Sequence, residues 1–419
     1  MKVQQMPNWS DTRDEDDNML PILDRPRLQH EFLEYLQSRT EHIKTIVTQH
    51  FTHVSQLPWF FRAFEYLKRG LAWIIRKPFY RPFIPRRRPL SLKSGYLLMD
   101  FIDAQQGTVL SNMPPPQTVE QKQNLYRSLS RIMLDLARPL PRIDSFTINN
   151  NGEISLSHRP LTLRLAVSEN QDIPTEILPQ SCYVTADSYF HDLLKCQDLI
   201  LQHQPNAVRS KLDAEGQMAV LTIMRSLTAT FTQHHLRYGP FIFRLTDLHP
   251  GNIFVDRQYR VTAIVDLEWG CSLPIETQHP PFWLSGYQLD QLEGERIGDF
   301  DNMCDDFLQM FEDEDNSTER DSCLEPGFCT AVMKSALERK THWYWSSLNE
   351  PRGMYNLFME HIQPLFAPSH SEGEQACWFQ EILAPYWSLA ASAFVQDKVR
   401  QREYYLKKLE AKHLSLNSG

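Results

Sequence analysis

The sequence contains little glycine and no long apolar run. It has 15 glycines in 419 residues, which argues against a protein dominated by glycine-rich loops. No stretch of about 18 uncharged apolar residues occurs, so the sequence predicts no transmembrane helix. The seven cysteines form no C-x-x-C pair, which disfavours a zinc ribbon or a thioredoxin-type motif and suggests reduced thiols. The polar, acidic start is unlike a secretory signal, and we expect a cytoplasmic protein.

The remaining composition is ordinary for a globular protein. Apolar residues make up 42% and charged residues 23%, and this length is typical of two or three domains or of one bilobal enzyme. The net charge of −9 is unevenly spread: residues 290–321 are strongly acidic and residues 62–93 strongly basic. Such blocks are usually solvated faces, although the acidic block could attract a cationic ligand and the basic block an anionic surface.

Apolar periodicity predicts an α+β chain that is mainly helical. The predicted helices are 27–50, 58–75, 117–138, 185–203, 213–236, 299–314, 327–347, 352–366, 376–395 and 397–412. The predicted strands are 95–102, 241–245, 253–255, 261–265 and a hairpin of 143–148 with 153–157. We interpret residues 1–24 as a disordered acidic tail and residues 76–90 as a basic, proline-rich connector.

The most informative segment is 241–270, where two apolar strands bracket Asp247 and Asn252 and a third leads to Asp266. D-x-x-x-x-N is the spacing of a kinase catalytic loop, in which the aspartate accepts the substrate hydroxyl proton and the asparagine holds a metal ion. Asn252 and Asp266 offer the hard oxygen ligands that Mg²⁺ prefers. The spacing alone is common, and both loop residues could simply be turn formers.

Neighbouring residues could support such a site. If the third strand stays extended, Glu268 projects to the same side as Asp266, where it could contact a metal or form a salt bridge. His249 could support Asp247 or be an ordinary loop histidine, and Gly251 would serve backbone geometry. The aromatic residues nearby could line a substrate pocket or belong to the core; these are Trp269, Trp283 and Tyr287.

The segment FIFRLTDLHPGNIFVDRQYRVTAIVDLEWG resembles the aminoglycoside phosphotransferase and choline kinase branch of the protein kinase-like fold, in which HxDxHxxN is followed by IxDxE. GYLLMDFIDAQQGTVLSN (95–112) is similar to the hinge and first C-lobe segment of its large fungal subfamily, and LEWGCSLPIETQHPPFWL to its C-lobe. The resemblance covers about 95–300 well and 300–400 loosely. One departure is Leu245, which stands where the family usually has a histidine.

The resemblance implies ATP- and Mg²⁺-dependent phosphoryl transfer to the hydroxyl of a small molecule. Asp247 would be the catalytic base, with His249 and Gly251 supporting its loop. The metal would be held by Asn252 and Asp266, with Glu268 beside them. The nucleotide would meet the hinge at four residues: Met99, Asp100, Phe101 and Ile102.

The resemblance also implies a largely complete C-lobe and a mostly missing N-lobe. Gly70 is the only glycine among the first 94 residues, and no G-x-G-x-x-G or V-A-x-K-like segment is present. The implied organisation is a tail (1–24), a remnant helical region with the connector (25–94) and a phosphotransferase-like domain (95–413). Within that domain, 95–104 would be the hinge and 105–413 the C-lobe.

Two functions remain open on these grounds. The first is a phosphotransferase acting on an unidentified small molecule, which could be cationic. The second is a non-catalytic, pseudokinase-like relic or binding module without a nucleotide clamp. No motif supports nucleic-acid binding, and the apolar segment 58–76 could dock on the C-lobe, self-associate or contact an anionic membrane.

Overall fold

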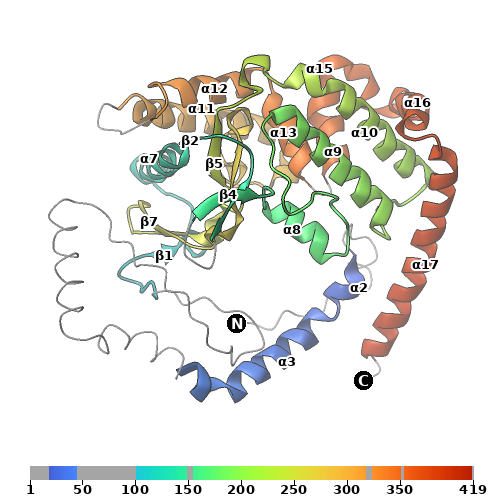
Figure 1. Cartoon of the computed structure of the whole chain (residues 1–419), viewed down its shortest axis with the longest axis horizontal. Coiled ribbons are helices and arrows are strands. Elements are labelled where there is room, and N and C mark those ends of the chain that lie inside the picture. Colours follow the sequence, from blue (N-terminus) through green and yellow to red (C-terminus); the bar gives the residue numbers. More distant parts are fainter. Residues whose placement is uncertain (1–17, 45–100, 149–153, 318–322, 351–352, 418–419) are drawn as a thin grey trace. The chain divides into compact units, whose positions relative to one another are not determined.

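The computed structural model describes residues 18–44, 101–148, 154–317, 323–350 and 353–417 (Figure 1). The chain divides into two units. The first contains helices α2 (Met19–Ile22) and α3 (Arg25–Ser38), and the second contains nearly all described residues from Ile102 onward. The predicted helix 58–75 and residues 95–100 of the predicted hinge strand lie outside the described residues.

The first unit shows that the predicted tail is too long. Met19 in α2 and Leu23 just after it are buried, so residues 18–24 are structured. Helix α3 begins after Asp24 and has a proline in its first turn, a position that leaves no intrahelical hydrogen bond unmade. The prediction of a helix from residue 27 is therefore confirmed over the range of α3.

The strands of the second unit form two small antiparallel sheets. One contains β1 (Thr108–Val109), β6 (Ile253–Val255) and β7 (Val261–Ile264), in that order; the other contains β2 (Pro139–Leu140), β5 (Phe241–Leu245) and β8 (Gly270–Pro274). A separate hairpin joins β3 (Ser145–Ile148) to β4 (Ile154–His158). Strands β3 to β7 were predicted. The two-residue strands β1 and β2 are too short to show a period of two.

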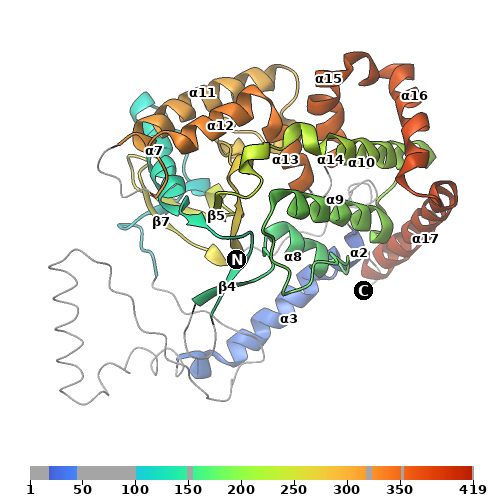
Figure 2. The same cartoon turned by 45° about the horizontal axis from the view of Figure 1, so that its top comes forward.

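Helices make up most of the second unit. They are α7 (Val119–Leu136), α8 (Leu163–Asn170), α9 (Ala186–His203), α10 (Lys211–Phe231), α11 (Glu295–Asp315), α12 (Phe328–Glu338), α13 (Thr341–Asn349), α14 (Met354–Leu357), α15 (Gln363–Phe366), α16 (Gly373–Leu383) and α17 (Ala391–Asn417). Helix α10 packs on α9, α16 and α17, and α11 packs on α7 and α12 (Figures 1 and 2). The α+β, mainly helical class is confirmed. None of the described helices is both long and apolar enough to cross a bilayer.

Two predicted helix boundaries are wrong. The predicted helix 327–347 is interrupted at Lys340, which adopts a left-handed conformation with φ of 56° and separates α12 from α13. The predicted break near residue 396 is absent, because α17 runs without interruption from Ala391. The chain turns earlier, at the 3-10 turn Ala384–Trp387, where Pro385 prevents α16 from continuing.

The acidic block lies largely on α11, and several of its carboxylates are paired. Glu314 accepts two hydrogen bonds from the Arg131 guanidinium of α7, at 2.7 and 3.0 Å. Asp306 pairs with Lys122 of α7 at 2.7 Å. These two acids therefore link α11 to α7.

Candidate functional site

Main-chain hydrogen bonds bring the predicted site residues into one region. The Thr246 N–H donates to the carbonyl of Trp269 at 3.2 Å, and the Val265 N–H donates to the carbonyl of Asn252 at 3.0 Å. The loop that follows β5 therefore lies beside the turn that follows β7. Asp247 is next to one of these bonds and Asp266 is next to the other.

Asp247 and Asn252 are joined directly. The Asn252 amide nitrogen Nδ2 donates to the Asp247 backbone oxygen at 3.0 Å and to its carboxylate oxygen Oδ2 at 3.2 Å. Asn252 is 6% exposed, so these bonds fix a buried side chain. None of the described residues donates to its remaining oxygen, Oδ1, which leaves that atom available to a cation.

The predicted supporting residues shape this loop. The Nδ1 atom of His249 accepts a hydrogen bond from the Gly251 N–H at 3.0 Å, which leaves Nε2 as the protonated nitrogen of a neutral ring. That Nε2 lies 3.6 Å from the Asp247 carboxylate. A Cβ atom at residue 251 would sit 2.6 Å from the His249 ring, so this close approach requires glycine. The Trp283 indole also holds the loop, donating to the Leu248 carbonyl at 2.9 Å.

The charge on Asp247 is set by its surroundings. Partial burial raises the pKa of its carboxyl group, and the negative charges of Asp266 and Glu268 raise it further, whereas His249 and the Asn252 hydrogen bond act in the opposite direction. Two neighbouring carboxylates therefore act on Asp247. A carboxyl group with a raised pKa is the better proton acceptor.

Asp266 has an unusual backbone conformation. Its φ of 57° and ψ of 55° are left-handed, and a 3-10 turn, Leu267–Trp269, follows it. The strand does not stay extended as far as Glu268, so the expectation that Asp266 and Glu268 share a strand face is wrong. Both side chains are exposed. Left-handed residues other than glycine are uncommon and often mark functional positions.

The donor set fits a sparsely coordinated cation. Over the described ranges, no three His, Cys, Asp or Glu side chains group closely enough to hold a metal ion. Mg²⁺ commonly takes only one or two protein oxygens and fills its other positions with water and phosphate. The Asn252 Oδ1 atom and the Asp266 carboxylate could supply two oxygens of that kind.

The predicted hinge contacts are only partly described. Met99 and Asp100 lie outside the described residues. Phe101 is 87% exposed and Ile102 is half-buried, both in irregular chain. Nucleotide binding at these four residues stays a prediction.

A cavity of about 480 Å³ adjoins the loop, and sequence reasoning missed most of it. Thr246 and Leu248, which flank Asp247, both line it, together with residues of β5, α8, α9 and α13. Of the three aromatic residues suggested from sequence, only Trp283 is among its lining residues. Helix α8, which contributes Arg164 to the wall, was not predicted, and no motif marks that arginine.

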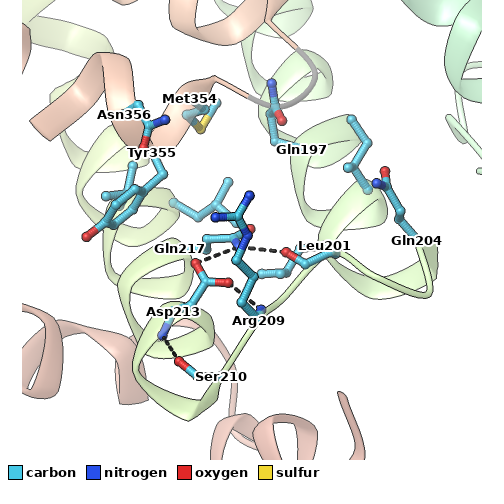
Figure 3. Close-up of a pocket in the computed structure, with 14 residues that line it drawn as sticks. Gln197, Leu201, Gln204, Arg209, Ser210, Asp213, Gln217, Met354, Tyr355 and Asn356 are labelled. Carbon is cyan, nitrogen blue, oxygen red and sulfur yellow. Dashed lines mark hydrogen bonds between the residues drawn. The ribbon is translucent and has the colours of Figure 1, made fainter. Parts of the chain in front are cut away.

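A second cavity, of about 420 Å³, lies between α9, α10 and α14 (Figure 3). Polar groups in its wall hold the start of α10. The Ser210 hydroxyl accepts from the Asp213 N–H at 3.2 Å, and the Asp213 carboxylate accepts from the Arg209 N–H at 2.6 Å. Gln217 donates to the Ala207 carbonyl at 2.7 Å. These groups are engaged in helix capping, so the cavity beside Asp247 is the better candidate for a ligand.

Comparison with protein-family models, with curated proteins and with solved structures found no match to this chain. The kinase-like resemblance therefore rests on the sequence motifs quoted above.

Proposed function

We propose that this chain carries the acceptor half of a kinase-like phosphotransferase site. The observation that supports it best is the pairing of Asp247 with Asn252, together with the main-chain bond that holds Asn252 beside the residue preceding Asp266. A base, a metal-ligating amide and a metal-ligating carboxylate would then act on one reaction centre. Phosphoryl transfer depends chiefly on such positioning and charge stabilisation.

Each residue has a distinct role in this proposal. The Asp247 carboxylate takes the proton of the acceptor hydroxyl, whose oxygen forms a bond to the terminal phosphorus of ATP while the bond from that phosphorus to the bridging oxygen breaks and ADP leaves. His249, whose Nε2 atom lies 3.6 Å from that carboxylate, would help to orient it. Mg²⁺, held by Asn252 and Asp266, would neutralise charge on the transferred phosphoryl group.

The test is phosphoryl transfer from ATP to a panel of hydroxyl compounds, with and without Mg²⁺. We expect Asp247→Asn to lower the rate by about 10²- to 10⁴-fold, the usual contribution of a general base. Asp266→Asn should raise the Mg²⁺ concentration needed for half-maximal rate. A matched control is Asp256→Asn, since Asp256 pairs with Arg260 in the turn between β6 and β7. Equal loss in the control and in Asp247→Asn would contradict the assignment.

The second candidate is a non-catalytic binding module. It is favoured by the sequence upstream of the domain, where Gly70 is the only glycine in 94 residues and no phosphate-covering loop is encoded. With half of the nucleotide cleft lacking, affinity for Mg²⁺·ATP would be weak. Calorimetry separates the candidates: a Kd tighter than about 10 μM, equivalent to about −7 kcal/mol, would exclude the relic.

A further inference from the structure

Arg164 is a buried cation with no hydrogen-bond partner among the residues that the structure describes. It lies in the first turn of α8, is 6% exposed, and lines the cavity beside Asp247. Across the described residues, none of its three guanidinium nitrogens has a hydrogen-bond acceptor. Burial also lowers the pKa of Arg164. Burying a charge in this way is costly unless something pairs with it.

A nearby arginine, Arg159, has the partners that a buried guanidinium group usually has. Arg159 donates to both carboxylate oxygens of Glu169 at 2.6 Å and to the Ile177 carbonyl at 2.7 Å. Among the described residues, Arg164 has no equivalent hydrogen-bond acceptor. Glu350 lines the same cavity, and its charge favours the protonated state of Arg164, but no ion pair joins Arg164 to any described residue.

The rest of the wall combines positive charge with aromatic surface. Its charged residues are Arg164, Arg244 and Glu350, so their net charge is +1. One guanidinium nitrogen of Arg244 donates hydrogen bonds to the Thr277 hydroxyl and backbone carbonyl, at 2.7 and 2.8 Å. His279 is neutral near pH 7, because burial lowers its pKa to about 4. Large apolar side chains fill much of the remainder, among them Tyr189, Phe190, Phe243, Phe282, Trp283 and Trp345.

We propose that this cavity binds the carboxylate group of an apolar or aromatic hydroxy acid, with Arg164 as its ionic partner. The claim rests on the proposed function, because it assigns the acceptor substrate of the site at Asp247. A volume of about 480 Å³ falls in the usual range for small-molecule pockets. The sign of charge is opposite to that of the cationic acceptor considered from sequence, because the charged residues that line this cavity have a net positive charge.

The test measures binding of benzoate to the full-length protein by calorimetry, without nucleotide. Benzamide and benzylamine serve as the neutral and cationic counterparts of the same shape. We expect benzoate to bind with a Kd of about 1 mM or tighter and the other two compounds to bind more weakly. Arg164→Gln should weaken benzoate binding at least about tenfold, since it removes charge-assisted hydrogen bonds. Glu350→Gln should strengthen it by removing an opposing charge.

Controls separate this claim from the proposed function. Arg138→Gln alters an exposed arginine outside the cavity and should leave benzoate affinity unchanged. Asp247→Asn should also bind benzoate, because it removes only the base. If benzoate binds in an Arg164-dependent way while no phosphoryl transfer occurs, the anion site stands and the phosphotransferase assignment fails. If benzoate binds no better than benzamide, or Arg164→Gln binds it equally well, the anion site is refuted.

Discussion

Arg164 and Arg159 lie five residues apart in the chain but have opposite electrostatic surroundings. Arg164 has no hydrogen-bond partner within the described part of the chain, whereas Arg159 pairs with Glu169. Replacing an unpaired buried charge with an apolar side chain of similar volume removes its desolvation cost, and replacements of buried ionic groups by apolar ones have stabilised proteins by about 1–4 kcal/mol. We therefore expect Arg164→Met to raise the free energy of unfolding of the ligand-free protein, measured by urea denaturation.

Arg159→Met is the matched control. It breaks the bonds to Glu169 and to the Ile177 carbonyl, so we expect it to lower the free energy of unfolding. A loss of stability in Arg164→Met comparable to that in the control would show that Arg164 is already compensated inside the protein. Gain of stability together with loss of benzoate binding is the combination expected of a residue retained for function.

At the scale of elements, the contact between β5 and β8 limits what residue 270 can be. A Cβ atom at Gly270 would clash with the Phe243 ring, and Phe243 lines the cavity. Overpacking a fitted contact typically costs about 1–3 kcal/mol. Gly270→Ala should therefore lower the free energy of unfolding by that order and weaken benzoate binding, both measured as above.

A second glycine provides the comparison. Gly298 lies within α11, and a Cβ atom there would have no neighbour within 4 Å. Gly298→Ala should stabilise the protein by about 0.5–1 kcal/mol through its higher helix propensity. If the two substitutions change stability in the same direction, the packing between β5 and β8 is looser than the geometry indicates.

The elements also show what could be predicted from sequence. Strands β5, β6 and β7 have mainly apolar sequences with clear turns between them, and the D-x-x-x-x-N spacing located Asp247 and Asn252. The left-handed turn at Asp266 could not be foreseen, because it depends on the pairing of β5 with β8. Arg164 could not be recognised either, since lacking a partner is a property of the folded neighbourhood.

At the scale of the whole molecule, buried histidines make stability depend on pH. Burial lowers the pKa of His279 to about 4, of His342 to about 3 and of His361 to about 4. In the unfolded protein the pKa values of these histidines return to about 6.5. At pH values between the folded and the unfolded pKa, the unfolded state therefore binds more protons than the folded state. The stability that these neutral histidines contribute is fully present above about pH 6.5 and is lost as the pH falls toward 4.

Carboxyl groups with raised pKa values oppose this trend: the shift of Glu276 is large, and the pKa values of Asp144, Asp247 and Glu360 are also raised. Burial raises the pKa of Glu276 to about 7, so its contribution is present below about pH 4.5 and is lost as the pH rises through 7. Between pH 4.5 and 6.5 the three histidines outweigh Glu276, the carboxyl group with the large opposing shift. Each additional proton bound by the unfolded state changes the slope of the free energy of unfolding against pH by up to about 1.4 kcal/mol per pH unit. We therefore expect the free energy of unfolding to fall on acidification.

Urea unfolding at several pH values from 5 to 7.5 tests this expectation. His342→Asn should make the fall on acidification shallower by up to about 1.4 kcal/mol per pH unit, whatever its effect at pH 7.5. His235→Asn, at an exposed position, should leave the slope unchanged. An identical slope in parent and His342→Asn would mean that His342 is protonated in the folded protein.

Helix α9 forms part of the cavity wall at one end and contacts α17 at the other. Tyr189, Phe190 and Leu193, in its first half, form part of the cavity wall. At its other end, the buried ammonium group of Lys398 from α17 donates to the carbonyls of Gln202 and Gln204, at 2.9 and 2.7 Å. The last helix of the chain, which contributes no described residue to the cavity, is therefore anchored to the helix that forms part of the cavity wall.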